Sequence, residues 1–432
     1  MSKSGSRLIG ICIMSAMIAL MTIGIFAIRA SEQAEGTSGF SSKQMISAAI
    51  GIVVFIFFAN VSYQRLGQFA YGFFGFSLVL LIIMAVARFT HHSSSLLPSI
   101  KGAYRWIDLG FYNLQPSEIA KLAQILLLAW YLRLGNHYRK LTGLSVPFIL
   151  TFIPLFLILI EPDLGTSMLL VPLLFTMLFM AGAKMSHLGG IILCAVIVIF
   201  LPIPTHTEGM GQKELESRRQ TAYWISPSGD MLISAAPLAV MEFHQLQRVD
   251  GWLRQDDPEV IQGIGYQLYH SKMVLGSGQV TGRGDWDDAD FYFRMLPDDH
   301  TDFIFSVIGG QWGFIGCAGV LLLYLFIIVL GIEIASATDD PFGRMLAIGV
   351  ISLFVSQLVI NTGMTMGLLP VTGMTLPLIS YGGSSLLINC AALGLLVSVA
   401  SRRPIFFSRK PFEHKDDYGA APYRPLEFSP GP

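Results

Sequence analysis

The sequence has few charged residues and no excess of either sign. Only 13% of its 432 residues are Asp, Glu, Lys or Arg, about half the share found in soluble proteins. The formal net charge is −1, so the chain has no basic field that would attract nucleic acid. We therefore exclude nucleic acid as a partner.

Cysteine is also scarce. Cys12, Cys194, Cys317 and Cys390 are the four cysteines of the chain. All lie in apolar segments, where free cysteine behaves as a small hydrophobic residue. The longest polar loop has none. We therefore predict neither a disulfide framework nor a zinc site.

Long apolar runs are abundant instead. Hydrophobic residues make up 53% of the chain, and several windows of roughly 17 to 25 residues can each cross a membrane core of about 30 Å. We predict an all-α membrane protein with about ten transmembrane helices. The first run is too long for a signal peptide and is expected to be retained. The expected spans are residues 8–28, 44–60, 68–88, 116–133, 145–160, 164–182, 187–203, 302–333, 343–366 and 384–400.

An even number of spans places both termini on one side. The short loops of that side hold Lys3, Arg7, Arg65, Arg133, Arg139, Lys140, Lys184, Arg344, Arg402 and Arg403. The positive-inside rule makes that side cytoplasmic. We thus predict a membrane domain over residues 1–403, followed by a disordered cytoplasmic tail over 404–432.

The polar loop over residues 204–300, between the seventh and eighth spans, is then extracytoplasmic. It contains about two fifths of the charged residues, and loops of this length are usually functional or disordered. Residues 265–284 predict a short interfacial helix followed by a tight glycine-containing turn. This pattern favours a functional loop.

Four motifs carry the candidate chemistry. The first pairs Arg105 and Trp106 with a Gln-Pro-Ser-Glu turn at residues 115–118 that opens the fourth span. Glu118 and Lys121 are three residues apart and share a helical face. Buried ionisable groups are costly unless they pair or line a hydrated cavity. A mutual ion pair is the structural interpretation, and a role in the site is the functional one.

The second motif is Glu161-Pro162-Asp163 at the hairpin between the fifth and sixth spans. Asp163 is expected to cap the sixth span. The two carboxylates flanking the proline would also suit a bound cation or an oriented lysine. Both interpretations are compatible.

The third motif precedes the eighth span and contains His300, Thr301 and Asp302. Thr301 or Asp302 would serve as a helix cap in the structural interpretation. In the functional one, partial desolvation of Asp302 at the membrane boundary favours its use as a general base.

The fourth motif covers residues 367–385, where two prolines and several glycines break any helix. Non-helical backbone beside a membrane must pack against protein or line a cavity. Ser384, near the end of this segment, is a candidate substrate contact. A purely structural re-entrant loop is the alternative.

Together these motifs resemble the SEDS (shape, elongation, division and sporulation) family over about residues 8–403. The matching elements are Arg-Trp-Ile at 105–107, Gln-Pro-Ser-Glu-x-x-Lys at 115–121, Glu-Pro-Asp-x-Gly-Thr at 161–166, His-Thr-Asp-Phe-x-Phe at 300–305 and Pro-x-Ile-Ser-Tyr-Gly-Gly-Ser-Ser at 377–385. The resemblance implies a glycosyltransferase of the bacterial inner membrane that polymerises lipid II into glycan strands. It also implies a class B penicillin-binding protein as partner, and Asp302 as the catalytic residue.

The departing lipid diphosphate requires positive charge. The candidate cations are Arg105, Lys121, Lys272 and Arg283, with or without a divalent ion such as Mg²⁺ or Mn²⁺. The full set of expected substrate contacts is Arg105, Trp106, Glu118, Lys121, Asp163, Lys272, Arg283, His300 and Ser384.

Two departures from the family pattern are visible. Gly310 and Gln311 stand where relatives usually carry glutamates, so no role of those glutamates transfers to this chain. The glycine-rich turn at 276–280 lacks one usual glycine, and an acidic cluster at 285–290 reads as solvated loop. The Ser271-Lys272 pair and residues 282–284 resemble the elongation (RodA) branch more than the division (FtsW) branch.

Two other function classes fit the same chain. A lipid II flippase would also have many spans and buried charges, although its ionisable groups are expected at mid-bilayer instead of one face. A scaffold that only activates its transpeptidase is the third possibility, which the missing glutamates keep open.

Overall fold

The computed structural model describes residues 3–36, 38–90, 96–98, 104–110, 112–133, 137–199, 202–222, 224–226, 228–235, 243–283, 296 and 300–402. The predicted tail at 404–432 and the acidic cluster at 285–290 lie outside this part.

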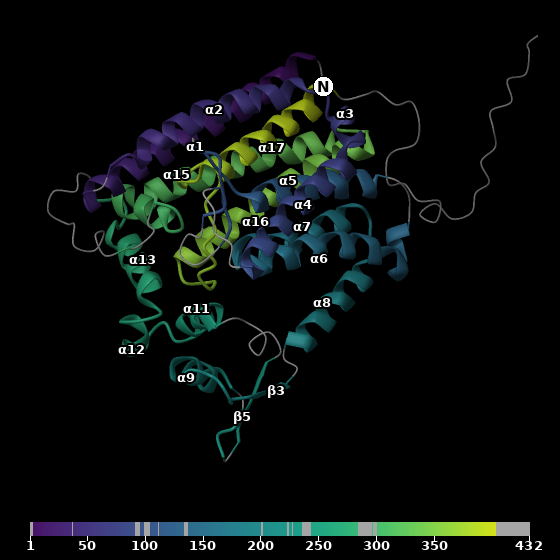
Figure 1. Ribbon diagram of the computed structural model, residues 1–432. Coiled ribbons are helices and arrows are strands. Elements are labelled where there is room, and N and C mark those ends of the chain that lie inside the picture. Colours follow the sequence, from purple (N-terminus) through teal and green to yellow (C-terminus); the bar gives the residue numbers. More distant parts are fainter. Residues whose placement is uncertain are drawn as a thin grey trace, which may run out of the picture.

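The membrane domain is a bundle of long apolar helices (Figure 1). Each of the ten predicted spans falls on a helix. These helices are α1 (Lys3–Glu35), α2 (Phe40–Asn60), α4 (Ala70–Phe89), α5 (Pro116–Leu132), α6 (Ser145–Ile160), α7 (Leu164–Met180), α8 (Met185–Ile199), α15 (Ile304–Ser336), α16 (Pro341–Thr365) and α17 (Gly383–Ser401). In the described part of the chain, seven helices are long and apolar enough to cross a membrane, and α7 and α8 are shorter apolar helices. The all-α membrane fold class is therefore confirmed.

Burial separates the inner helices of the bundle from the outer ones. In the most apolar window of α17, 83% of residues are buried, and in that of α16, 72%. The corresponding share is 28% in α2 and in α15. Helices that are apolar all round fit the core of a bundle, so α16 and α17, together with the largely buried α5, form the centre of the bundle.

The first helix is longer than expected because Glu32 anchors its end. The buried Glu32 carboxylate accepts hydrogen bonds from the backbone N–H of Phe40, from the Ser41 N–H at 3.1 Å and from the Ser41 hydroxyl. A carboxylate at these N–H groups satisfies the unpaired start of α2. The α1–α2 connection is therefore only a short turn.

The described part of the large polar loop contains regular secondary structure. It contains α9 (Gln212–Thr221), α11 (Phe243–Leu253), α12 (Pro258–Ile261) and α13 (Tyr266–Ser277). It also contains a three-stranded antiparallel sheet of order β3-β5-β4, formed by Pro202–His206, Met231–Ala235 and Trp224–Ile225. The sheet was not predicted, and α8 ends at Ile199 where the expected span continued, because Pro202 starts β3. The predicted interfacial helix corresponds to α13.

Helix α15 is kinked at Gly313, which has φ 63° and ψ −161°. The turn after α13 fills this kink. Phe314 N–H donates to the Gln279 carbonyl at 2.8 Å, and Arg283 N–H donates to the Gly310 carbonyl at 3.1 Å. These bonds replace backbone bonds that a helix loses at a kink. A Cβ on Gly278 would overlap the Gly309 carbonyl oxygen, so the approach requires glycine.

The remaining short elements connect the helices. They are α3 (Tyr63–Gln68), the 3-10 helices η1 (His137–Arg139) and η2 (Leu141–Leu144), and the two-residue strands β1 (Ile107–Asp108) and β2 (Asn113–Leu114). Strands β1 and β2 pair antiparallel. This hairpin places the first motif directly before α5.

Candidate active site

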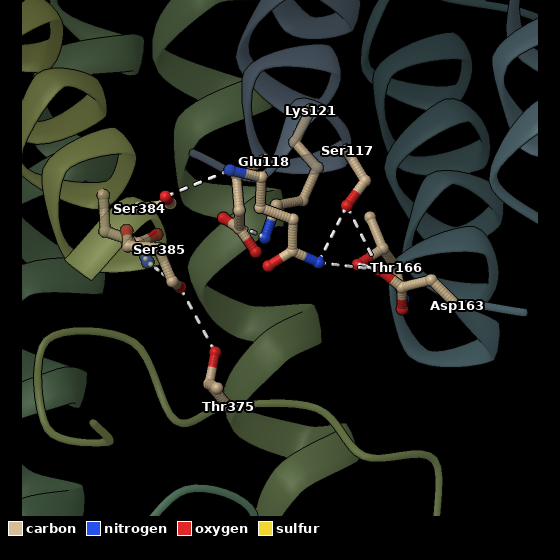
Figure 2. Close-up of polar contacts among 10 residues, drawn as sticks. Ser117, Glu118, Lys121, Asp163, Thr166, Thr375, Ser384 and Ser385 are labelled. Carbon is tan, nitrogen blue, oxygen red and sulfur yellow. Dashed lines mark hydrogen bonds and ion pairs between the residues drawn. The ribbon is translucent and has the colours of Figure 1, made fainter. Parts of the chain in front are cut away.

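Asp163 joins the start of α5 to the start of α7 (Figure 2). Its carboxylate caps α7, since it accepts from Thr166 N–H at 3.1 Å and from the Thr166 hydroxyl at 2.9 Å. It also accepts from the Ser117 hydroxyl at 3.1 Å and from the Gln115 amide at 3.0 Å. The predicted cap is thus confirmed. The same carboxylate holds the first and second motifs together, which sequence spacing did not reveal.

Glu118 and Lys121 form the ion pair that their spacing suggested. The Lys121 ammonium lies 2.7 Å from Glu118 Oε2 (Figure 2). The residues are only 4% and 2% exposed. Breaking such a pair would leave a buried charge without compensation, which is strongly destabilising. The pair therefore orients α5, and a further role of either residue toward substrate stays a prediction.

Arg105 is attached to the hairpin of the second motif. Its Nε donates to the Glu161 carbonyl at 2.9 Å, and its Nη2 donates to the Pro162 carbonyl. Trp106, the next residue, is half-buried. Arg105 thereby fixes the turn that carries Glu161 and Pro162.

Glu161 is completely buried in this turn. Within the part of the chain that the structure describes, neither of its carboxylate oxygens has a hydrogen-bond partner. Burial, with a smaller contribution from the Asp163 charge and an opposing one from Arg105, raises the pKa of Glu161 to about 9. Glu161 is therefore protonated at neutral pH.

Ser384 links the fourth motif to the first. Its hydroxyl accepts from Gln115 N–H at 3.1 Å and donates to the Asn113 carbonyl at 2.6 Å. Thr375 and Ser385, from the same motif, share a hydrogen bond of 3.2 Å (Figure 2). The start of α17 is thus tied to β2 and to the non-helical segment before it.

Asp302 is half-buried and lies two residues before the start of α15. The helix begins at Ile304 with Phe303 at its N-cap, so neither Thr301 nor Asp302 occupies the capping position. Asn361 donates from Nδ2 to the Asp302 carbonyl at 2.9 Å and to the Met374 carbonyl at 2.6 Å. This buried amide of α16 therefore holds Asp302 beside the fourth motif.

Arg248 of α11 is the cation next to Asp302. A Cβ built on Gly373 would lie 3.4 Å from Asp302 Oδ2 and 3.4 Å from Arg248 Nη1. The guanidinium also donates to the Val371 carbonyl at 3.2 Å. Sequence reasoning missed Arg248, because a single arginine in an amphipathic loop helix has no local pattern that distinguishes it.

Residues 371–375 lie between the Asp163 cluster and the Asp302 carboxylate. On one side, a Cβ on Gly165, in the first turn of α7, would lie 3.1 Å from the Thr372 carbonyl oxygen. On the other side, Gly373 borders Asp302 and Arg248. The Asp163 cluster and the Asp302 carboxylate therefore flank the same short segment.

Three further residues were predicted to contact substrate: His300, Lys272 and Arg283. His300 stacks on Phe40 with ring centroids 4.5 Å apart, and its carbonyl accepts from Tyr381 N–H at 2.9 Å. Lys272 donates to Gln255 Oε1 at 2.9 Å, next to Gly367. Arg283 is placed differently. It lies at the kink of α15, beside Gly310, roughly 9 Å along the helix from the start of α15.

The arrangement does not suit a divalent cation at Asp163. Its two oxygens already accept four hydrogen bonds, from Thr166, Ser117 and Gln115. Within the described ranges, no group of three or more His, Cys, Asp or Glu side chains is positioned to hold a metal ion.

The fold and the site define a multi-pass membrane protein in which the first and second motifs meet at Asp163, and the third and fourth motifs lie together at Asp302. The chain belongs to the SEDS family, since the family model for FtsW, RodA and SpoVE, described as cell cycle protein, matches residues 6–404.

Named relatives are similar over most of their length. The peptidoglycan glycosyltransferase RodA of Treponema pallidum is 32% identical, with 90% of this chain and 96% of the relative covered. The peptidoglycan glycosyltransferase MrdB of Escherichia coli is 31% identical, with 84% and 86% covered.

Two solved structures share the fold. A chain from a peptidoglycan synthase complex that coordinates polymerization and crosslinking matches with TM-score 0.67 and 26% identity, covering 90% of this chain and 96% of that one. The rod shape determining protein RodA of Thermus thermophilus matches with TM-score 0.58 and 25% identity, covering 90% and 96%.

Proposed function

We propose that this chain is a peptidoglycan glycosyltransferase that polymerises lipid II into glycan strands during cell-wall synthesis. The observation that carries the proposal is the half-buried Asp302 carboxylate beside the Arg248 guanidinium at Gly373. The names of the relatives from Treponema pallidum and Escherichia coli support the same activity.

In the proposed reaction, Asp302 is the general base. Its carboxylate removes the proton from the acceptor sugar hydroxyl, whose oxygen then attacks the anomeric carbon of the donor sugar. The bond from that carbon to the lipid diphosphate breaks, and the diphosphate leaves from the opposite face with the electron pair. The base must lie within hydrogen-bond reach of the hydroxyl, which a side chain partly open to water allows.

Arg248 supplies positive charge where the diphosphate develops its negative charge. A guanidinium offers a planar set of donors that suits phosphate oxygens. Among the cations expected at first, Lys121 is paired with Glu118, and Arg105 is bonded to two backbone carbonyls away from Asp302. Arg248 is also held by a backbone carbonyl, that of Val371, but it lies beside Asp302. Contacts of Arg105, Trp106, Lys272 and His300 with substrate remain predictions. Arg283 is the least favoured of the predicted cations because it lies at the kink of α15.

An apolar groove of about 250 Å³ between α2, α4, α5 and α17 fits a lipid-linked substrate. Among the described residues, Ser384 is its one polar lining residue, and this serine is bonded to the turn of the first motif. We propose that the groove holds part of the lipid chain. The other lining residues are Val54, Phe58, Phe73, Phe76, Leu114, Ile119, Leu122, Leu387, Ile388 and Ala391.

The proposed orientation follows from the distribution of basic residues. The short loops that hold most of the Lys and Arg side chains face the cytoplasm, together with both termini. Asp302 and the large loop then face outward in the inner membrane. As partner we propose a class B penicillin-binding protein, in line with the synthase complex that shares the fold.

The test uses the purified full-length chain in detergent with lipid II. We expect glycan strands to lengthen, and Asp302→Asn to abolish lengthening while leaving the melting temperature and co-purification with the transpeptidase unchanged. Retained polymerisation by Asp302→Asn would remove this residue as the base. If the wild-type protein only moves lipid II between the leaflets of vesicles, it is a flippase. If it does neither but still activates its transpeptidase, it is a scaffold.

A further inference from the structure

Helix α11 of the large loop contacts the non-helical segment at 367–373 at two points. Trp252 Nε1 donates to the Gly367 carbonyl at 3.0 Å, and Arg248 Nη1 donates to the Val371 carbonyl at 3.2 Å. The two donors are four residues apart on α11, so they lie on one helical face. The two acceptors are also four residues apart, in the opposite chain direction. The pair of contacts therefore aligns α11 with this segment.

The contact at Gly367 lies where two parts of the large loop meet the end of α16. A Cβ on Gly367 would lie 2.8 Å from Gln255 Oε1 and 3.2 Å from the Lys272 Cδ. The Lys272 ammonium donates to the same Gln255 oxygen at 2.9 Å. Gly367 has φ +80°, which suits glycine. Trp252 is therefore one of several side chains that hold the loop at this point.

Trp252 is better suited than Arg248 to fix the position of α11. The indole is half-buried and packs against an apolar cluster that includes Leu268, Phe303 and Val371. Arg248 is exposed, and a long arginine side chain loses much rotamer freedom when one position is imposed on it. The place that the guanidinium occupies thus depends on how firmly the helix backbone is held one turn further along.

We propose that Trp252 is a positioning residue: it fixes α11 on residues 367–371 and thereby keeps Arg248 beside Asp302. This inference rests on the proposed function, in which Arg248 stabilises the departing diphosphate. Trp252 acts through Arg248 and requires no contact with substrate. Phenylalanine in its place keeps an aromatic ring in the apolar cluster but offers no donor to the buried Gly367 carbonyl. That substitution therefore removes the hydrogen bond and leaves most of the packing.

The first test is a double-mutant cycle on the rate of lipid II polymerisation. Trp252→Phe should lower kcat about tenfold, the loss expected when a buried carbonyl is left without its donor. The double variant Trp252→Phe/Arg248→Gln should be no slower than Arg248→Gln alone, because a residue that acts through Arg248 has no further effect once the guanidinium is gone. Losses that multiply in the double variant would overturn the proposal.

The second test is hydrogen–deuterium exchange of the purified full-length protein in detergent, which does not depend on polymerisation. Trp252→Phe should speed exchange in residues 243–253, because amides exchange when a helix detaches locally. Exchange in residues 266–277 should stay unchanged, since the Ser271 hydroxyl still donates to the Thr365 carbonyl at 3.0 Å. The matched control is Leu253→Ala, which removes a side chain of α11 that is 59% exposed.

The outcomes separate this inference from the proposed function. Unchanged exchange of α11 in Trp252→Phe would refute the positioning role, as would an equal increase in Leu253→Ala. A wild-type rate in Arg248→Gln would refute the charge-stabilising role of Arg248, and the positioning role with it. A slow Arg248→Gln combined with a wild-type rate in Trp252→Phe would refute the positioning role alone and leave the proposed function standing.

Discussion

The Asp302 carboxylate and the Arg248 guanidinium lie on the same side of Gly373. The position of a Cβ on this glycine is 3.4 Å from Asp302 Oδ2 and 3.4 Å from Arg248 Nη1. Gly373 has φ +72°, a conformation that L side chains rarely adopt. Because Gly373 has no side chain, a carboxylate of the membrane domain and an arginine of the large loop can both lie close to its backbone.

The first prediction concerns Arg248. Arg248→Gln should lower kcat for glycan polymerisation by about 10²-fold, because charge stabilisation of a leaving group is lost. Arg248→Lys should recover part of the rate. The measurement is the rate of lipid II consumption at several substrate concentrations, so that kcat and KM separate. Arg254→Gln is the control, since Arg254 is also on this loop but pairs with Asp257. An equal loss in Arg254→Gln would assign the effect to loop folding.

The second prediction concerns the glycine turn at the α15 kink. Gly278→Ala should lower both melting temperature and activity, because its Cβ would overlap the Gly309 carbonyl oxygen. Gly276 is the matched control: among the described residues, its added Cβ has no atom within 4 Å apart from its chain neighbours and the backbone of its own helix. Gly276→Ala should be neutral or stabilising by up to about 1 kcal/mol, since alanine favours a helix. Similar melting temperatures for the two variants would contradict the proposed packing.

The positions of the spans were predictable because each depends on a continuous apolar run. Two local contacts also followed from spacing: the Glu118–Lys121 pair three residues apart, and the Asp163 cap of α7. Contacts between distant segments did not follow. Arg248 reaches Val371 across 123 positions, and no pattern near Arg248 encodes that approach. The insertion of residues 276–283 into the α15 kink was missed for the same reason.

The third prediction separates capping from the wider role of Asp163. Asp163→Ala should destabilise the protein by more than the about 1 kcal/mol expected for a lost cap, because the buried Ser117 hydroxyl and the Gln115 amide also lose their acceptor. Asp340→Ala is the comparison variant, since Asp340 caps α16 through Gly343 N–H at 2.9 Å and has only the Tyr63 hydroxyl as a further side-chain hydrogen-bond partner among the described residues. We expect thermal unfolding to show a larger loss for Asp163→Ala, and only this variant to lose activity. Loss of activity in both would indicate a general folding effect.

The last prediction is a pH dependence that originates at Glu161. Burial raises its pKa to about 9 in the folded protein, whereas an unfolded glutamate titrates near about 4.3. The folded state therefore holds a proton that the unfolded state releases, and this contribution to stability is complete below about pH 4 and is lost as the pH rises toward 9. The slope is at most about 1.4 kcal/mol per pH unit. Glu161→Gln keeps the shape of the neutral side chain but cannot titrate. Its melting temperature should thus be close to that of the wild type at pH 5 and higher at pH 8. If the two proteins lose stability in parallel between these pH values, Glu161 is already ionised in the fold, and Arg105 must then compensate its charge in the hairpin.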